Sequence, residues 1–191
     1  MTSFFDITST LPWPNAIGKR TAVGPLVGAA ESEAISELAR TTPLILVITA
    51  ATAAAHNLAS ELPFFLSDDR EILLVPDWET LPYDNFSPHE DIVSDRLKAL
   101  SRLPTLKSGV VIVSVTTLMH RLAPRHFIDA GVLSLKTGET LDAEQFVRNL
   151  TRNGYRSVDT VYEHGEFATR GSLLDVFPMG SDEPLRIDLF D

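Results

Sequence analysis

The sequence contains no cysteine, and its acidic residues outnumber its basic ones. Without cysteine the chain has no disulfide, no thiol nucleophile and no zinc ribbon. With 16 Lys and Arg against 26 Asp and Glu, the formal net charge is −10. Broad contact with nucleic acid depends on basic residues that neutralise phosphates, so this composition disfavours it and allows at most a local basic patch.

Long apolar segments and targeting signals are also missing. The longest apolar run, Leu44–Ile48, is far too short to cross a bilayer. Residues 1–6 lack the basic start and the apolar stretch of a signal peptide. We therefore expect a cytoplasmic chain without membrane contact. The 191 residues are enough for one domain with a good core or for two small ones.

After an irregular arm at residues 1–20, apolar runs alternate with helical patterns as far as residue 130. Runs that predict buried strands lie at 44–49, 72–75 and 110–115. Helical periodicity is found at 31–40, 50–62, 89–103 and 116–122, with Pro43 and Pro63 expected to follow the first two helices. Residues 21–130 are therefore predicted to form an α/β domain with a parallel sheet. Three strands are few for such a sheet, so we expect this domain to be incomplete and the chain to be part of a longer protein.

The pattern changes after Pro124, and we place a domain boundary near residue 130. A helix is predicted at 142–153, where Asp142 and Gln145 resemble a capping box. Strand-like segments lie at 132–136, 157–163, 166–177 and 185–190. Residues 131–191 are therefore expected to form a small α+β domain with an antiparallel sheet.

Residue patterns typical of catalysis are missing. The five histidines do not have the H-E-x-x-H spacing of a zinc site, and the chain has no G-x-S-x-G nucleophile elbow. The loop at 76–88 contains Trp78 and Tyr83 and follows a strand, where ligand sites of α/β proteins tend to lie. We expect these two aromatics to pack the loop onto the sheet, with a ligand site as the alternative.

One segment ahead of the first helix has a distant likeness to a phosphate-binding loop. Gly24 and Gly28 precede the helix, but no lysine follows them. A working P-loop needs that lysine to reach the phosphates. Glu31 falls about where the lysine would lie, and its charge would repel phosphate. We expect a degenerate loop that does not bind nucleotide.

The last strand pattern indicates a protein-binding surface. Alternation of side chains leaves Arg186, Asp188 and Phe190 on its outer face. An exposed Phe beside an exposed Arg is typical of an interface hot spot, although further chain covering Phe190 is an equal alternative. Arg170 lies in the preceding segment and joins this face only if an irregularity at Gly171 breaks strict alternation.

Several long motifs resemble the N-terminal module of bacterial transcription-repair coupling factors, the Mfd family. They are Asp77-Trp78-Glu79-Thr80-Leu81-Pro82-Tyr83-Asp84, then Glu163-His164-Gly165-Glu166-Phe167-Ala168-Thr169-Arg170-Gly171, and finally Arg186-Ile187-Asp188-Leu189-Phe190-Asp191. The match runs from about residue 21 to the end of the chain.

The resemblance implies a UvrB-like α/β domain that has lost its nucleotide-binding residues, followed by a small α+β domain that binds UvrA. The family's UvrA-contacting positions match Arg170, Arg186 and Phe190. The resemblance also implies that this chain is a non-catalytic module without a cofactor, which recruits UvrA to stalled RNA polymerase for nucleotide excision repair. ATP and magnesium would act in motor domains of a full-length DNA translocase, whose other domains contact RNA polymerase and DNA. The alternative is a UvrB-like nucleotide-dependent helicase or damage-recognition domain.

Overall fold

A computed structural model describes residues 11–13, 17–66, 70–81, 83–132 and 135–189. The chain divides into two compact units. The first comprises Met1–Val75 and Thr105–Met119, and the second comprises Pro76–Pro104 and His120–Asp191. Each unit is described by itself.

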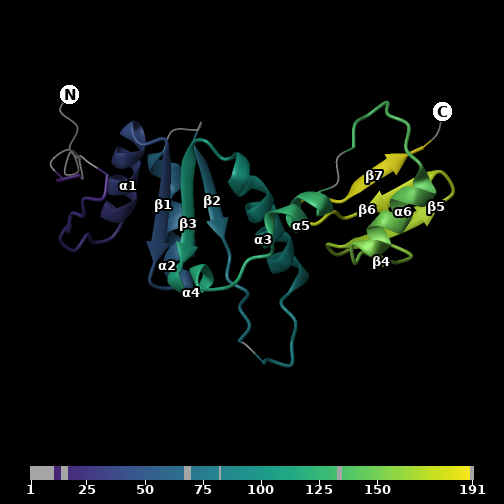
Figure 1. The fold of residues 1–191 in the computed structure, drawn as a ribbon, viewed down its shortest axis with the longest axis horizontal. Coiled ribbons are helices and arrows are strands. Elements are labelled where there is room, and N and C mark those ends of the chain that lie inside the picture. The colour runs from purple at the N-terminus through teal and green to yellow at the C-terminus, as the bar shows by residue number, and fades with distance from the viewer. Residues whose placement is uncertain (1–10, 14–16, 67–69, 82, 133–134, 190–191) are drawn as a thin grey trace. The chain divides into compact units, whose positions relative to one another are not determined.

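The first unit contains a parallel sheet with helices packed against it (Figure 1). Its strands are β1 (Leu44–Thr49), β2 (Glu71–Val75) and β3 (Gly109–Ser114), in the order β1-β3-β2. Its helices are α1 (Ala30–Thr41), α2 (Thr52–Phe65) and α4 (Val115–Leu118). All six residues of the central strand β3 are buried, as the unbroken apolar run predicted. The predicted α/β class with a parallel sheet is confirmed.

The core of the first unit lies between the sheet and the helices α1 and α2. Ile45, Val110 and Ile112 point from the sheet toward Leu58 and Leu62 of α2, and all five are buried. Because these aliphatic side chains leave water together, their burial accounts for most of the stability of this unit.

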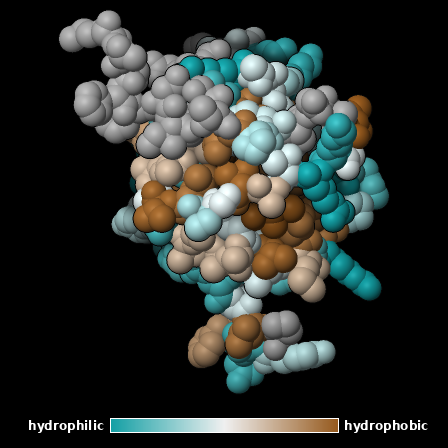
Figure 2. Space-filling model, turned by 90° about the vertical axis from the view of Figure 1, so that its left-hand side faces the viewer, coloured by the Kyte–Doolittle hydropathy of each residue, from teal (hydrophilic) through white to brown (hydrophobic). Residues whose placement is uncertain are grey.

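The opposite face of β1 leaves apolar side chains exposed. Leu44, Leu46 and Ile48 alternate with the core residues and are 44%, 57% and 51% exposed. Figure 2 turns the side of the molecule that carries α1 and β1 toward the viewer, and apolar surface gathers there. Among the described residues β1 pairs with β3 alone, so it is an edge strand.

Two helices of the first unit differ from the sequence prediction. Pro63 lies inside α2, which continues to Phe65, rather than beyond the helix. A proline near the end of a helix removes one backbone donor, and the last turn is still closed by Leu66 N–H, which donates to Leu62 O at 2.9 Å. The helix predicted at 116–122 is only the short α4, in which Ser114 Oγ caps Thr117 N–H.

The second unit combines a four-stranded sheet with helices. Its helices are α3 (Glu90–Arg102), α5 (Arg125–Gly131) and α6 (Ala143–Arg152). A 3-10 turn, Leu103–Thr105, follows α3 and spans the point at which the chain returns to the first unit. Its strands are β4 (Arg156–Ser157), β5 (Glu166–Arg170), β6 (Leu173–Val176) and β7 (Leu185–Asp188). The sheet order is β4-β5-β6-β7, with β4 parallel to β5 and the remaining pairs antiparallel. The predicted α+β class is confirmed.

Helix α6 covers the inner face of this sheet. Phe146 and Leu150 of α6 pack against Phe167, Leu174 and Val176 of the strands. The predicted start of this helix is correct, because the Asp142 carboxylate accepts a hydrogen bond from Gln145 N–H at 2.9 Å.

Several predicted boundaries in the second unit are wrong. The segment 166–177 is two strands rather than one, and of the segment 157–163 only Ser157 is in a strand. Residues 132, 135 and 136 form no strand, while 133–134 lie outside the described residues. Helix α5 was not predicted, because only two of its seven residues are large and apolar and the segment shows no clear helical period.

Candidate functional site

A tight turn between β5 and β6 sets which side chains share a face of the second sheet. Arg170 pairs with Leu173, so the turn contains only two residues, Gly171 and Ser172. Gly171 has φ of +61°, which favours glycine at the first position of such a hairpin turn. Residues that are paired across two antiparallel strands point to the same face of the sheet, so Arg170 and Leu173 share a face. Arg170 therefore shares a face with Leu173 and Asp175.

The face opposite α6 is called the outer face here. The strand registers place Ala168, Arg170, Leu173, Asp175, Arg186 and Asp188 on it, and alternation along β5 adds Glu166. Arg170 and Arg186 are exposed, whereas Asp175 is half-buried. The irregularity at Gly171 that the sequence required is thus a hairpin turn, and it brings both predicted arginines to one face. Phe190, the third predicted residue, lies outside the described residues.

Arg186 makes a bidentate ion pair with Asp175. The two residues lie directly opposite each other on β7 and β6. Arg186 Nε donates to Oδ1 at 2.6 Å, and Nη2 donates to Oδ2 at 2.8 Å. This hydrogen bonding, together with the positive charges of Arg186 and Arg170, lowers the pKa of Asp175 below its ordinary value. Paired bonds of this kind fix the guanidinium in orientation as well as in position.

Arg170 is held by the loop that precedes β5. Its Nη2 donates to Asp159 O and, at 3.2 Å, to Thr160 Oγ1. Because β6 lies between β5 and β7, the two arginines lie on either side of that strand and in adjacent rows of the outer face: Arg170 is opposite Leu173, and Arg186 is opposite Asp175.

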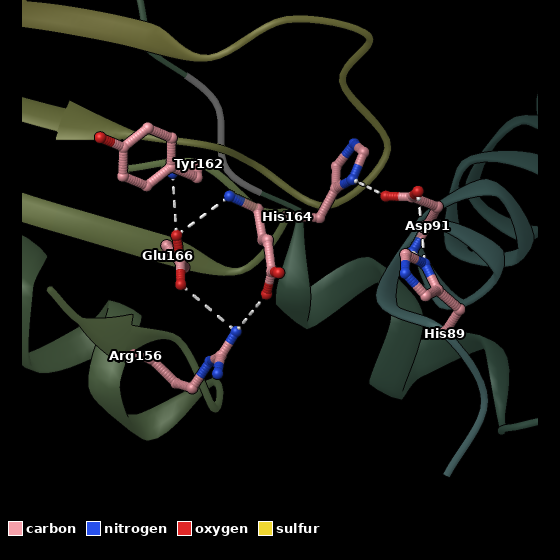
Figure 3. Close-up of polar contacts among 7 residues, drawn as sticks. His89, Asp91, Arg156, Tyr162, His164 and Glu166 are labelled. Atoms are coloured by element: carbon pink, nitrogen blue, oxygen red, sulfur yellow. Dashed lines mark hydrogen bonds and ion pairs between the residues drawn. The ribbon is translucent and has the colours of Figure 1, made fainter. Parts of the chain in front are cut away.

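The loop that holds Arg170 is itself organised by Glu166. The Glu166 side chain accepts backbone N–H groups from Tyr162 at 2.9 Å and from Glu163 at 3.0 Å (Figure 3). Arg156 Nη2 reaches its other carboxylate oxygen at 3.3 Å. The backbone N–H groups, that of Tyr162 first, hold the pKa of Glu166 below its usual value despite burial. Glu166 is only 7% exposed, so it is a structural carboxylate rather than a surface charge.

His164 links the same region to α3. Its Nδ1 lies 2.8 Å from Asp91 Oδ1, and its Nε2 lies 2.9 Å from Ser181 O (Figure 3 shows the first contact). The imidazole ring also packs against Phe177, with 4.0 Å between the ring centroids. With both ring nitrogens engaged within the fold, His164 has a structural part in joining the turn before β5 to α3.

The sequence alone did not single out Asp175 and Glu166. The signal for Asp175 was the dipeptide Gly171-Ser172, which is typical of a two-residue hairpin and would have placed Asp175 on the same face as Arg170. No comparable sequence signal existed for Glu166, because its partners are backbone N–H groups of a loop whose path depends on the folded sheet.

The predicted degenerate phosphate loop lies in the first unit. Gly24 and Gly28 are exposed, and Glu31 is exposed in the first turn of α1. Within residues 17–29 no strand precedes the helix, so the strand–loop–helix frame of a P-loop is incomplete there. The neighbouring hydroxyl of Ser32 is buried and donates to Glu61 Oε2 at 2.8 Å.

The aromatic loop between β2 and α3 is anchored on helix α3, whereas the prediction placed its contacts on the sheet. Trp78 packs on the guanidinium of Arg96, whose central carbon lies 4.3 Å from the ring centroid. Arg96 is 1% exposed and donates to Pro76 O, which anchors the start of the loop on α3. Tyr83 is fully exposed, so the expectation that it packs the loop onto the sheet is wrong.

Neither a metal-binding cluster nor a membrane-spanning helix occurs in the described part of the chain. It contains no cluster of three or more His, Asp or Glu side chains that could hold a metal ion. None of its helices is both long enough and apolar enough to span a bilayer.

Comparisons with known proteins identify the relatives of this chain. Residues 133–191 match the model of the "UvrB interaction domain" family. The chain is 45% identical over 179 residues to the transcription-repair-coupling factor of Escherichia coli, covering 93% of this chain and 15% of that protein. It is 44% identical to the Haemophilus influenzae factor, covering 88% and 15%, and 29% identical to the Bacillus subtilis factor, covering 91% and 15%. The chain thus spans about one-seventh of the length of these relatives, and the predicted resemblance is confirmed.

Proposed function

Because this chain is related to the transcription-repair-coupling factors over 93% of its length and contains a UvrB interaction domain, we propose that it is a non-catalytic module that binds UvrA. The outer face is the proposed contact surface. Arg170 and Arg186 donate charge-assisted hydrogen bonds to acidic groups of UvrA, and Phe190 fills an apolar pocket.

The observation that carries this proposal is the pair of exposed arginines on one face of a sheet within the matched domain. Both guanidinium groups are already held by neighbouring atoms, Arg186 by Asp175 and Arg170 by the loop at 159–160. An arginine that is ordered before binding loses less conformational freedom when it meets a partner, which favours tight association.

The overall charge of the chain also favours a protein partner over DNA. A net charge of −10 repels phosphates at long range, whereas two arginines on one face suit a few acidic side chains at close range. In the proposed pathway the module recruits UvrA to stalled RNA polymerase in the bacterial cytoplasm. ATP hydrolysis with magnesium, movement on DNA and polymerase contact are assigned to parts of the longer protein outside this chain.

Capture of the purified chain by immobilised UvrA tests the proposal. We expect Arg186→Ala to weaken capture by about 30-fold, as for a hot-spot arginine, and Arg186→Ala with Phe190→Ala to abolish it. Arg148→Ala is the matched control, because Arg148 pairs with Glu144 on α6, which covers the opposite face of the sheet. Undiminished capture by the folded double variant refutes the proposal, as does an equal loss in the control.

A titration with ATP separates this proposal from a nucleotide-dependent helicase. We propose that the chain does not bind ATP, since the exposed carboxylate of Glu31 replaces the cation that a phosphate loop needs at its helix start. Isothermal calorimetry with magnesium and ATP measures this directly. A magnesium-dependent affinity in the micromolar range would favour the helicase instead.

A further inference from the structure

We infer that Asp175 is a positioning residue for UvrA binding: it holds the guanidinium of Arg186 in one orientation on the outer face, so that the partner meets a fixed edge of hydrogen-bond donors. The inference rests on the proposed function and adds a residue to it.

The geometry of the pair leaves Arg186 oriented but still accessible. A guanidinium is planar and carries five N–H groups. Two of them, on Nε and Nη2, point at the carboxylate of Asp175, so the remaining three lie along its other edges. The Arg186 side chain is 62% exposed, whereas that of Asp175 is 22% exposed. The carboxylate therefore lies beneath the arginine and leaves its outer edges open to a partner.

Asp175 is well placed to fix a neighbour because its own backbone is fixed. It lies on β6, which is paired on both sides, with β5 and with β7. The same register places it across from Ala168 on β5 and Arg186 on β7. A short side chain on a strand that is paired on both sides has little conformational freedom. The Arg186 guanidinium bound to it is therefore also held in a defined position.

Asp175 favours binding by orienting Arg186, but its charge also has an electrostatic effect that disfavours an acidic partner. Its negative charge lies beside the Arg186 guanidinium, on the face that Arg170 shares, and lowers the positive potential that an acidic partner would meet. Removing it therefore has two consequences of opposite sign. Loss of orientation weakens binding and speeds dissociation, while the gain of one net positive charge speeds association. We expect orientation to be the larger effect, because both bonds of the pair join charged groups and are short, at 2.6 and 2.8 Å.

The test is the affinity of Asp175→Asn for purified UvrA, measured by surface plasmon resonance. We expect the Kd to rise about three- to tenfold, mainly through faster dissociation, which is the range for one newly flexible side chain at an interface. Asp182→Asn is the matched control. It makes the same charge change and removes an ion pair in the same unit, with Lys98 at 2.6 Å, but lies in the loop before β7. We expect it to leave the Kd within about twofold.

An unchanged or lower Kd for folded Asp175→Asn overturns the inference and assigns Asp175 to charge masking. A second measurement needs only the unaltered chain. The Nε–H proton of Arg186 should exchange slowly with water in NMR spectra, and fast exchange overturns the inference even if the variant fails to fold. The proposed function fails separately, when Arg186→Ala binds UvrA as well as the unaltered chain does.

Discussion

At the scale of single residues, Glu166 is the side chain whose replacement should most clearly destabilise the loop that holds Arg170. Glu166→Gln leaves the backbone N–H groups of Tyr162 and Glu163 facing an amide in place of a carboxylate. We expect a loss of about 1–3 kcal/mol in the free energy of unfolding at pH 7, because a buried charged acceptor is removed. Urea denaturation followed by circular dichroism measures this loss.

The effect of Glu166 should depend on pH in one direction. Its pKa in the folded chain is lower than the ordinary 4.5, so the carboxylate stabilises the fold above that pH. The stabilisation is lost as the pH falls through the folded-state pKa, and the gap between the unaltered chain and Glu166→Gln should then close. Glu163→Gln is the control, because Glu163 meets the same Arg156 but is 60% exposed. An equal loss in both variants would contradict the structural role of Glu166.

At the scale of elements, the turn at Gly171 decides whether Arg170 reaches the outer face. We expect Gly171→Ala to lower the free energy of unfolding by about 1–2 kcal/mol, because a residue with a Cβ is strained at φ of +61°. Gly131→Ala is the control, since Gly131 ends a helix and an added Cβ there meets no atom within 4 Å. Thermal unfolding of both variants tests this, and equal midpoints would contradict the strain argument.

The same turn explains which elements the sequence could predict. The strands of the first sheet lie on continuous apolar runs, so each run predicted its strand without reference to a partner. The expected burial is complete only for β3, because one face of β1 is exposed. The second sheet is exposed on one face, and the register of β5 against β6 depends on two small residues within the segment 166–177. Arg186 could be assigned to the outer face from alternation alone, whereas its pairing with Asp175 required the register of β6 against β7. Strand β4 could not be located, because its two residues are defined only by pairing with β5.

At the scale of the whole molecule, α3 is joined to loops of the second sheet that lie far along the chain. Ser94 Oγ accepts a hydrogen bond from Gly180 N–H at 2.8 Å, and Lys98 pairs with Asp182 at 2.6 Å. Asp91 contacts His164 at 2.8 Å. These contacts cross the predicted boundary near residue 130, because α3 lies before that residue in the chain and the sheet lies after it.

Excision of residues 131–191 measures what α3 contributes to the sheet. We expect the fragment to keep its core around Phe167 and Leu174 but to be less stable than in the whole chain, by about 1–3 kcal/mol for the lost hydrogen bonds. Amide hydrogen exchange of β5 and β6 reports this locally in both molecules. Ser94→Ala with Lys98→Ala in the whole chain is the matched control and should reproduce part of the loss. Equal protection in the fragment and in the whole chain would show that the sheet folds independently of α3. The boundary near residue 130 would then separate two segments that fold independently.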